Sequence, residues 1–170
     1  MEPGDPIRLQ IVLHYDGSSF HGWQLQPDQR TVQGEVQAAL ARLTGEERTV
    51  MGSGRTDAGV HATGQVASFQ VPARWDAAEM HRALNAVLPR DIWVQAVRRV
   101  DTSFHPRFDA RRRRYRYRVA TDPAGASPFH RHWCWPLGEA LDRTLLDRAA
   151  TLLPGTRSFR AFAKAGQPER

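Results

Sequence analysis

The sequence predicts an α+β protein built on a ferredoxin-like (βαββαβ) domain with an antiparallel or mixed sheet. Four short stretches of the first hundred residues alternate apolar and polar positions, as strands with one buried face do. Two stretches between them carry apolar residues at helical spacing. The order is strand, helix, strand, strand, helix, strand, which is the split βαβ arrangement. We therefore expect one folded half over residues 5–100.

The first strand and the first helix are the clearest of these elements. Residues 7–15 alternate, and every odd position from Ile7 to Tyr15 is apolar or aromatic. Thr31 can cap the following helix, because its side chain can accept a hydrogen bond from an unpaired N–H of the first turn. The apolar positions of that helix recur every three or four residues: Val32, Val36, Ala39, Leu40 and Leu43. Both elements thus present an apolar face to one core.

The remaining elements of this half follow with short connections. We expect a second strand at about 48–53 and a third at about 65–71, where Pro72 ends the pairing. Asp76 and Glu79 form a capping-box-like pair that opens the second helix. The inward positions of that helix are Met80, Leu84 and Val87, and a fourth strand follows at about 92–99.

A glycine-bracketed loop, residues 54–62, carries the candidate catalytic group. Gly54 and Gly59 allow backbone conformations closed to other residues and let a partner approach the main chain. Asp57 lies two positions after Arg55, whose charge favours the ionised carboxylate. An ionised carboxylate suits nucleophilic work. An aspartate in such a loop can equally cap its own turn, so both interpretations are open at this point.

The charge of the chain favours a polyanionic partner. Lysine and arginine total 24 against 18 acidic residues, a formal charge of +6, and Lys164 is the one lysine among them. Arginine suits bidentate phosphate contacts and base stacking, although the same skew can reflect codon bias. A single cysteine, Cys134, excludes an internal disulfide and fits a reducing compartment. The sequence shows neither a membrane-spanning apolar run nor a signal peptide, so we expect a cytoplasmic protein without membrane contact.

From residue 101 onward the composition changes. Phe104, His105, Pro106, Arg107 and Phe108 form an aromatic and basic loop, and arginines alternate with Tyr115, Tyr117 and Val119 in the stretch 114–119. Such interleaving suits a surface that grips a nucleic acid backbone and stacks on bases, or else a solvated strand face. His130, His132 and Cys134 alternate without a second ligand pair, so we expect a strand that enters the sheet rather than a zinc site. A helix is expected at about 141–153, with Leu145, Ala149 and Leu152 inward.

Two motifs carry a resemblance to a known family. Gly54-Arg55-Thr56-Asp57-Ala58-Gly59-Val60-His61 closely resembles the signature of the TruA family of tRNA pseudouridine synthases. Tyr15-Asp16-Gly17, followed by His21 to Gln26, is similar to the N-terminal motif of the same family. Within that second motif, Trp23 could stack on a base or pack the loop, and we favour packing.

The resemblance implies a reaction and its residues. The family isomerises uridine to pseudouridine in the anticodon stem-loop of tRNA, at nucleotides 38 to 40, without a metal or other cofactor. Asp57 would be the nucleophile, at the sugar or at the ring; Arg55 would hold the nucleotide once it is flipped out, and Tyr115 would stack on the uracil. The segment from Phe104 to Phe108 would contact RNA, with Pro106 where alanine is also usual. Homodimers are usual in the family.

The resemblance covers only the first two-thirds of the usual family chain. Residues 101–170 would then be the start of a second, RNA-binding half that is truncated here. A catalytically impaired RNA-binding fragment is therefore the alternative to an active isomerase. A metal-dependent hydrolase using Asp57, His61 and His105 is the remaining hypothesis, and it is disfavoured because these residues lack a helical or strand ligand spacing.

Overall fold

The computed structural model describes residues 5–156 and 158–162; the polar end, residues 167–170, lies outside them. The chain divides into two compact units, one ending at Arg114 and the other beginning at Tyr115. Each unit is described by itself below.

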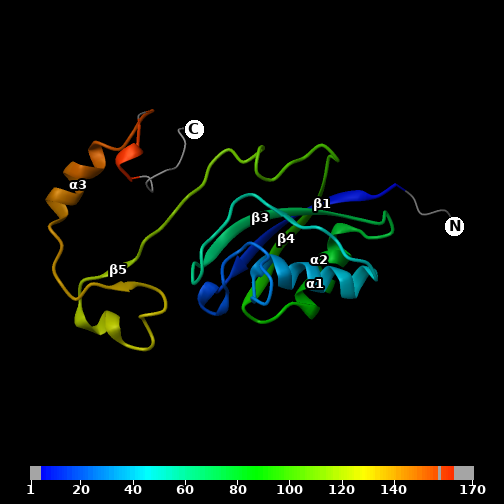
Figure 1. The fold of residues 1–170 in the computed structure, drawn as a ribbon, viewed down its shortest axis with the longest axis horizontal. Coiled ribbons are helices and arrows are strands. Elements are labelled where there is room, and N and C mark those ends of the chain that lie inside the picture. Colours follow the sequence, from blue (N-terminus) through cyan, green and yellow to red (C-terminus); the bar gives the residue numbers. More distant parts are fainter. Residues whose placement is uncertain (1–4, 157, 163–170) are drawn as a thin grey trace. The chain divides into compact units, whose positions relative to one another are not determined.

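The first unit is an antiparallel sheet with two helices (Figure 1). Its elements, in chain order, are β1 (Ile7–Tyr15), α1 (Val32–Thr44), β2 (Met51–Gly52), β3 (Ala62–Val71), α2 (Ala77–Val87) and β4 (Ile92–Val100). The four strands lie in the order β2-β3-β1-β4. The α+β class and the predicted order of elements are therefore confirmed for this part of the chain.

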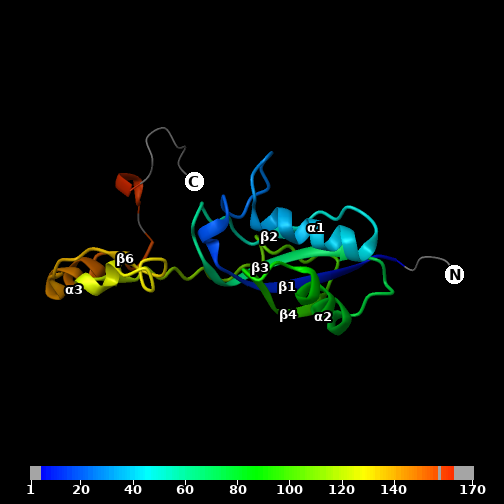
Figure 2. The ribbon, with the colours of Figure 1, turned by 90° about the horizontal axis from the view of Figure 1, so that it is seen from below.

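The central strand β1 fixes which residues share a face. Leu9 lies opposite Phe69 of β3, and Ile11 lies opposite Ala67. On its other side, Leu13 pairs with Val94 of β4 after a register shift. Because side chains alternate along a strand, the odd-numbered residues of β1 all point to one face, where both helices pack. Figure 2 shows the same layers from below.

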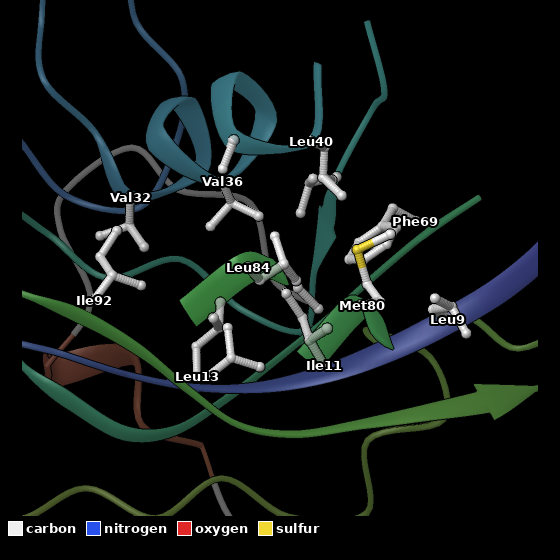
Figure 3. Close-up of a cluster of buried hydrophobic side chains, with 14 of the residues drawn as sticks. Leu9, Ile11, Leu13, Val32, Val36, Leu40, Phe69, Met80, Leu84 and Ile92 are labelled. Carbon is white, nitrogen blue, oxygen red and sulfur yellow. The ribbon is translucent and has the colours of Figure 1, made fainter. Parts of the chain in front are cut away.

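The core of this unit lies between that face and the two helices. Figure 3 shows Val32, Val36 and Leu40 of α1 converging with Met80 and Leu84 of α2 on the strand side chains. All ten side chains labelled there are buried. Burial of a leucine- or valine-sized side chain contributes roughly 1.5–3 kcal/mol, so this layer is the main stabilising feature of the unit. The predicted apolar positions of both helices are confirmed, with Leu43 and Val87 partly buried at the edge.

The predicted helix starts are also confirmed. The Thr31 hydroxyl accepts a hydrogen bond from the Gly34 N–H, and the Asp76 carboxylate accepts one from the Glu79 N–H. Helix α1 ends at Gly45, whose left-handed backbone (φ +78°) lets its N–H return to the Ala41 carbonyl. Each cap satisfies a backbone group that the helix itself leaves unpaired.

The second strand is shorter than the pattern predicted, and α1 supplies the reason. Strand β2 covers Met51–Gly52 rather than residues 48–53. The N–H of Val50 donates to the side-chain oxygen of Gln37, and the Val50 carbonyl accepts from the side-chain amide of Gln33. Val50 is buried, but its backbone bonds to helix side chains rather than to a neighbouring strand.

The second unit contains little regular structure, and two predictions there need correction. Strand β5 covers only Val119–Ala120, so most of the alternating stretch 114–119 is not a strand. It pairs in parallel with β6 (Trp135–Pro136) in a separate two-stranded sheet. Alternation fixes which way side chains point, but a strand also needs a neighbour to pair with.

The predicted strand through His130, His132 and Cys134 is wrong. Residues 127–134 form successive turns, in which the N–H groups of His130 and Arg131 both donate to the Ser127 carbonyl. A short 3-10 helix, Pro123–Ala126, precedes them. Turn hydrogen bonds within the segment thus replace the strand pairing that the alternation suggested.

Helix α3 (Arg143–Thr151) confirms the predicted helix with slightly shorter bounds. Its apolar side chains are not inward, however, because no residue of α3 is buried, and Leu145 and Leu152 are 57% and 66% exposed. A final 3-10 turn covers Arg160–Phe162.

Candidate active-site loop

The loop between β2 and β3 presents the predicted catalytic pair to solvent. Arg55 and Asp57 are exposed, whereas Thr56 between them is half-buried. The Asp57 carbonyl accepts a hydrogen bond from the Val60 N–H, which closes a tight turn. Gly59 in this turn has φ +78°, a backbone conformation that glycine adopts without strain. The loop therefore projects the Asp57 side chain outward from an ordered turn.

The segment from Gly17 to Trp23 holds this loop by backbone contacts. The Trp23 N–H donates to the Thr56 carbonyl at 2.9 Å, and the Gly59 N–H donates to the Phe20 carbonyl at 3.2 Å. Gly22 lies so close that a Cβ there would be 2.6 Å from the Thr56 carbonyl oxygen. The two motifs that carried the family resemblance are thus packed main chain against main chain.

Two polar side chains from the sheet bind the loop from below. The Tyr15 hydroxyl and the Thr56 hydroxyl share a hydrogen bond of 2.9 Å. The Gln65 amide donates to the Gly54 carbonyl at 2.7 Å, and its oxygen accepts from the Ser53 hydroxyl at 2.9 Å. Tyr15 and Gln65 are both buried, and burial raises the pKa of the Tyr15 phenol above its ordinary value. The phenol therefore stays neutral and acts as a hydrogen-bonding group.

Trp23 packs in the interior and does not present a stacking surface. Its side chain is 2% exposed, and its indole lies against Gly52, where a Cβ would come within 2.6 Å of the ring. The favoured interpretation, packing, is confirmed. Gly52 is required there because the indole occupies the space of a side chain.

A charged cluster connects this region to the start of β4. The Arg30 guanidinium donates two hydrogen bonds to Asp91, at 2.7 and 3.0 Å, and a third to Glu35 at 2.7 Å. Hydrogen bonding to Asp91 is the main reason that the pKa of Arg30 is raised. The same guanidinium lies 4.2 Å from the centre of the Phe20 ring. Since the Phe20 carbonyl binds Gly59, this cluster supports the segment that holds the loop.

Arg55 and Asp57 are not bonded to each other. Within the part of the chain that the structure describes, the Asp57 carboxylate forms no hydrogen bond or ion pair, so the position of its backbone decides where it points. His61, four residues on, contacts the preceding segment instead: its Nδ1 lies 3.1 Å from the Gly17 nitrogen and 3.0 Å from an Asp16 oxygen. Among the described residues, no three histidine, cysteine or acidic side chains gather as a metal-ligating group.

The aromatic and basic loop after β4 forms a compact turn. The His105 Nδ1 accepts hydrogen bonds from the N–H groups of Arg107 and Phe108, and the His105 ring lies 4.3 Å from the Phe108 ring. Pro106 is buried, whereas Phe108 is 76% exposed with the Arg107 guanidinium 6.0 Å from its centre. Phe104 is half-buried. An exposed ring beside a guanidinium offers both stacking and phosphate contacts.

The arginine run reaches the loop through one member. The Arg113 guanidinium donates to the Ser53 carbonyl at 2.8 Å and lies beside Gly54. Tyr115 is the first residue of the second unit, and its ring is 72% exposed.

The sequence reasoning assigned no role to Tyr15, Thr56, Gln65, Arg30 or Arg113. One signal was available for Gln65. It lies on the same inward face of the third strand as Ala67 and Phe69, and a buried polar residue on such a face needs hydrogen-bond partners. The contacts of Arg30 with Asp91 and of Arg113 with Ser53 join residues 60 or more positions apart, and no local pattern indicates them.

Comparison with known protein families finds one family that matches this part of the chain. A family model described as tRNA pseudouridine synthase matches residues 11–109, which include both motifs and the loop. The chain belongs to this family. A tRNA pseudouridine synthase A of Moorella thermoacetica is 48% identical over 95% of this chain. Proteins of the same name from Brevibacillus brevis and Maridesulfovibrio salexigens are 45% and 41% identical over 93% and 94% of it.

The chain spans only part of the length of these synthases. The alignments cover 66% of the Moorella protein, 64% of the Brevibacillus protein and 58% of the Maridesulfovibrio protein. No helix among the described residues is long and apolar enough to cross a membrane.

Proposed function

We propose that this chain is a tRNA pseudouridine synthase that isomerises uridine to pseudouridine in the anticodon stem-loop, at nucleotides 38 to 40. The observation that carries the proposal is the Asp57 loop: a carboxylate that bonds to none of the residues that the structure describes, exposed on a turn that is held from two sides. Its relatives from Moorella thermoacetica and Maridesulfovibrio salexigens are named tRNA pseudouridine synthase A, which supports the formation of pseudouridine in tRNA. We place the protein in the cytoplasm and expect it to act as a homodimer, as the family resemblance implies.

The fold supports the assignment of the first unit as a ferredoxin-like catalytic half, residues 5–100. The strand order β2-β3-β1-β4, all antiparallel, is the order in which two βαβ units interleave. This topology brings the end of β2 and the start of β3 to one end of the sheet, beside the end of β1. The loop with Asp57 is therefore anchored on rigid strands at both of its ends.

In the proposed reaction the target nucleotide leaves the base stack, because a stacked uridine exposes neither its sugar carbon nor its ring. Asp57 attacks either the ribose carbon or the pyrimidine ring, the bond between N1 and the ribose carbon breaks, and the uracil turns. The same ribose carbon then bonds to C5, and the bond to the Asp57 carboxylate breaks. The C5 proton is lost and N1 gains a proton, so the atoms balance without a cofactor. Arg55, exposed two residues before Asp57, holds the flipped nucleotide by its phosphate or fills the vacated space.

We assign RNA binding to the loop from Phe104 to Phe108 and substrate stacking to Tyr115. Arg107 and Phe108 present a cation and an exposed ring side by side. The His105 side chain accepts a hydrogen bond from the Arg107 N–H and so fixes the backbone there. Phe104 is half-buried and Pro106 is buried, so these two residues anchor the turn. The exposed phenol of Tyr115 has the free ring face that stacking on a base requires. In this proposal residues 101–170 begin the second, RNA-binding half.

The test is product formation by the purified chain on unmodified tRNA transcripts, with carbodiimide mapping of pseudouridine. Asp57→Asn should abolish product and leave tRNA affinity within about threefold, since one exposed carboxylate contributes little to phosphate binding. Asp28→Asn is the matched control, because Asp28 is also exposed and its positive φ suits asparagine. Full activity in Asp57→Asn would refute the assignment.

One observation favours an alternative, a catalytically impaired RNA-binding fragment: no residue of α3 is buried, and its side chains Leu145 and Leu146 are more than half exposed. This alternative predicts tRNA binding without product. Arg107→Gln should then weaken binding equally for all tRNAs and lower the slope of log affinity against log salt by about 0.7–0.9. Product formation by the purified chain would exclude it.

A further inference from the structure

We propose that Tyr15 is a positioning residue, whose buried hydroxyl fixes Thr56 and thereby the direction of the Asp57 side chain. This inference rests on the proposed function of the Asp57 loop. Tyr15 is 4% exposed, so it acts on the reaction through Thr56 and does not touch the RNA.

The first step of the argument is that the Asp57 carboxylate forms no hydrogen bond or ion pair with any of the described residues. Its backbone is held on one side by the turn to Val60 and on the other side by Thr56. The side at Thr56 is more constrained than the side at Val60, because the Thr56 carbonyl accepts a hydrogen bond from the Trp23 N–H and the Thr56 hydroxyl binds the Tyr15 hydroxyl. Losing the hydroxyl contact leaves one hydrogen bond at this point of the loop.

The second step is that Tyr15 itself cannot move. Its ring is packed in the core at the end of β1, and its backbone pairs with Ala62 of β3 and Ile92 of β4. The Gln65 side chain, which is also buried on the sheet, donates its amide N–H to the Gly54 carbonyl at 2.7 Å. Gln65 and Tyr15 therefore connect the loop to the sheet at Gly54 and at Thr56, on both sides of Arg55.

The third step is that the phenol stays protonated. Burial raises its pKa, so the hydroxyl remains available to Thr56 throughout the range in which an enzyme of this kind works. A neutral, buried hydroxyl bonded to a second hydroxyl is suited to orient a neighbour and not to transfer a proton to a substrate.

The experiment removes one hydroxyl at a time from the full chain. Tyr15→Phe keeps the ring, and Thr56→Val keeps the shape of the side chain, whereas Thr56→Ser keeps the hydroxyl. We expect kcat to fall about tenfold or more in the first two, because small misplacements of a reacting group are costly, with KM unchanged within about twofold. Thr56→Ser should stay near the wild-type kcat. The double variant Tyr15→Phe/Thr56→Val should be no worse than the poorer single one, because both remove the same bond.

The matched control is Thr44→Val, which removes a buried hydroxyl that donates to the Leu40 carbonyl in α1, away from the loop. It should lower stability without lowering kcat. Unchanged kcat in Tyr15→Phe, an effect confined to KM, or additive effects in the double variant would overturn the inference.

Failure of the proposed function is distinguished by a second readout. Should the wild-type chain form no pseudouridine, amide hydrogen exchange over residues 54–61 decides the positioning role. Tyr15→Phe should accelerate exchange there about tenfold while Thr44→Val leaves it unchanged, as expected when an opening that the hydroxyl prevents becomes more populated. Equal exchange in wild type and Tyr15→Phe would overturn it.

Discussion

Replacing Gly22 with alanine should displace the candidate catalytic loop. Gly22 has φ +88°, and its added Cβ would lie 2.6 Å from the Thr56 carbonyl oxygen and 3.2 Å from the Asp57 carbonyl carbon. The left-handed backbone alone costs an alanine about 1–2 kcal/mol. Overpacking against a backbone that cannot yield adds about 1–3 kcal/mol. We therefore expect Gly22→Ala to lower the free energy of unfolding of the first unit by about 2–5 kcal/mol.

The matched control separates strain from contact. Gly45 has a similar φ of +78°, but a Cβ there would meet nothing within 4 Å. Gly45→Ala should therefore lower the free energy of unfolding only by the strain of the left-handed backbone, about 1–2 kcal/mol. Hydrogen exchange of the β1 amides measures the stability of the first unit in both variants, separately from that of the second unit. Pseudouridine formation should fall about a hundredfold in Gly22→Ala, because Thr56 and Asp57 are displaced together, and change little in Gly45→Ala. Equal effects of the two substitutions on stability would refute the close approach.

Two further predictions concern the charged residues that support the loop. Arg30→Lys should lower the free energy of unfolding by about 1 kcal/mol. The reason is that lysine cannot form the bidentate contact with Asp91 and also reach Glu35. An unchanged midpoint of urea unfolding would contradict this prediction. The second prediction concerns Asp16, where burial raises the pKa but hydrogen bonds from Ser18 and the nearby His61 outweigh it and lower the pKa below 3.8. A lowered pKa stabilises the fold above pH 3.8, and that contribution is lost as pH falls through the folded-state pKa. As the pH is lowered from about 5 to about 2, the melting temperature should therefore fall more steeply for wild type than for Asp16→Asn. Parallel plots of melting temperature against pH would contradict this prediction.

The fold of the first unit could be predicted because the apolar residues that form its core recur at regular intervals in the sequence. Alternation in residues 7–15 identifies the face that packs on the helices, and the inward positions Met80 and Leu84 meet that face in the core. The start of β2 could not be predicted in this way. The Val50 backbone bonds to Gln33 and Gln37, and only the folded position of α1 brings those amides within reach.

In the second unit, periodicity alone was misleading. Tyr115, Tyr117 and the stretch from His130 to Cys134 alternate as strand residues do, yet they form irregular segments and turns. A strand is defined by its partner, and in the described residues 115–156 and 158–162 pairing is limited to two short strands. The amphipathic pattern of α3 likewise predicted the helix itself correctly, but it also predicted an inward apolar face, and no residue of α3 is buried.

The candidate site shows the same division between local and long-range information. The sequence pattern indicated Asp57 and Arg55 as the candidate catalytic pair because glycines, charge and a turn lie within nine residues. What holds them could not be read in the same way, because Tyr15 and Thr56 are 41 positions apart and meet only when β1 and the loop reach the same end of the sheet. A loop motif without its support would have an aspartate of the same chemistry and no fixed direction. The activity proposed here therefore depends as much on a buried phenol and amide as on the exposed carboxylate, and a substitution at Gln65 that spares the fold should lower kcat in the same way as one at Tyr15.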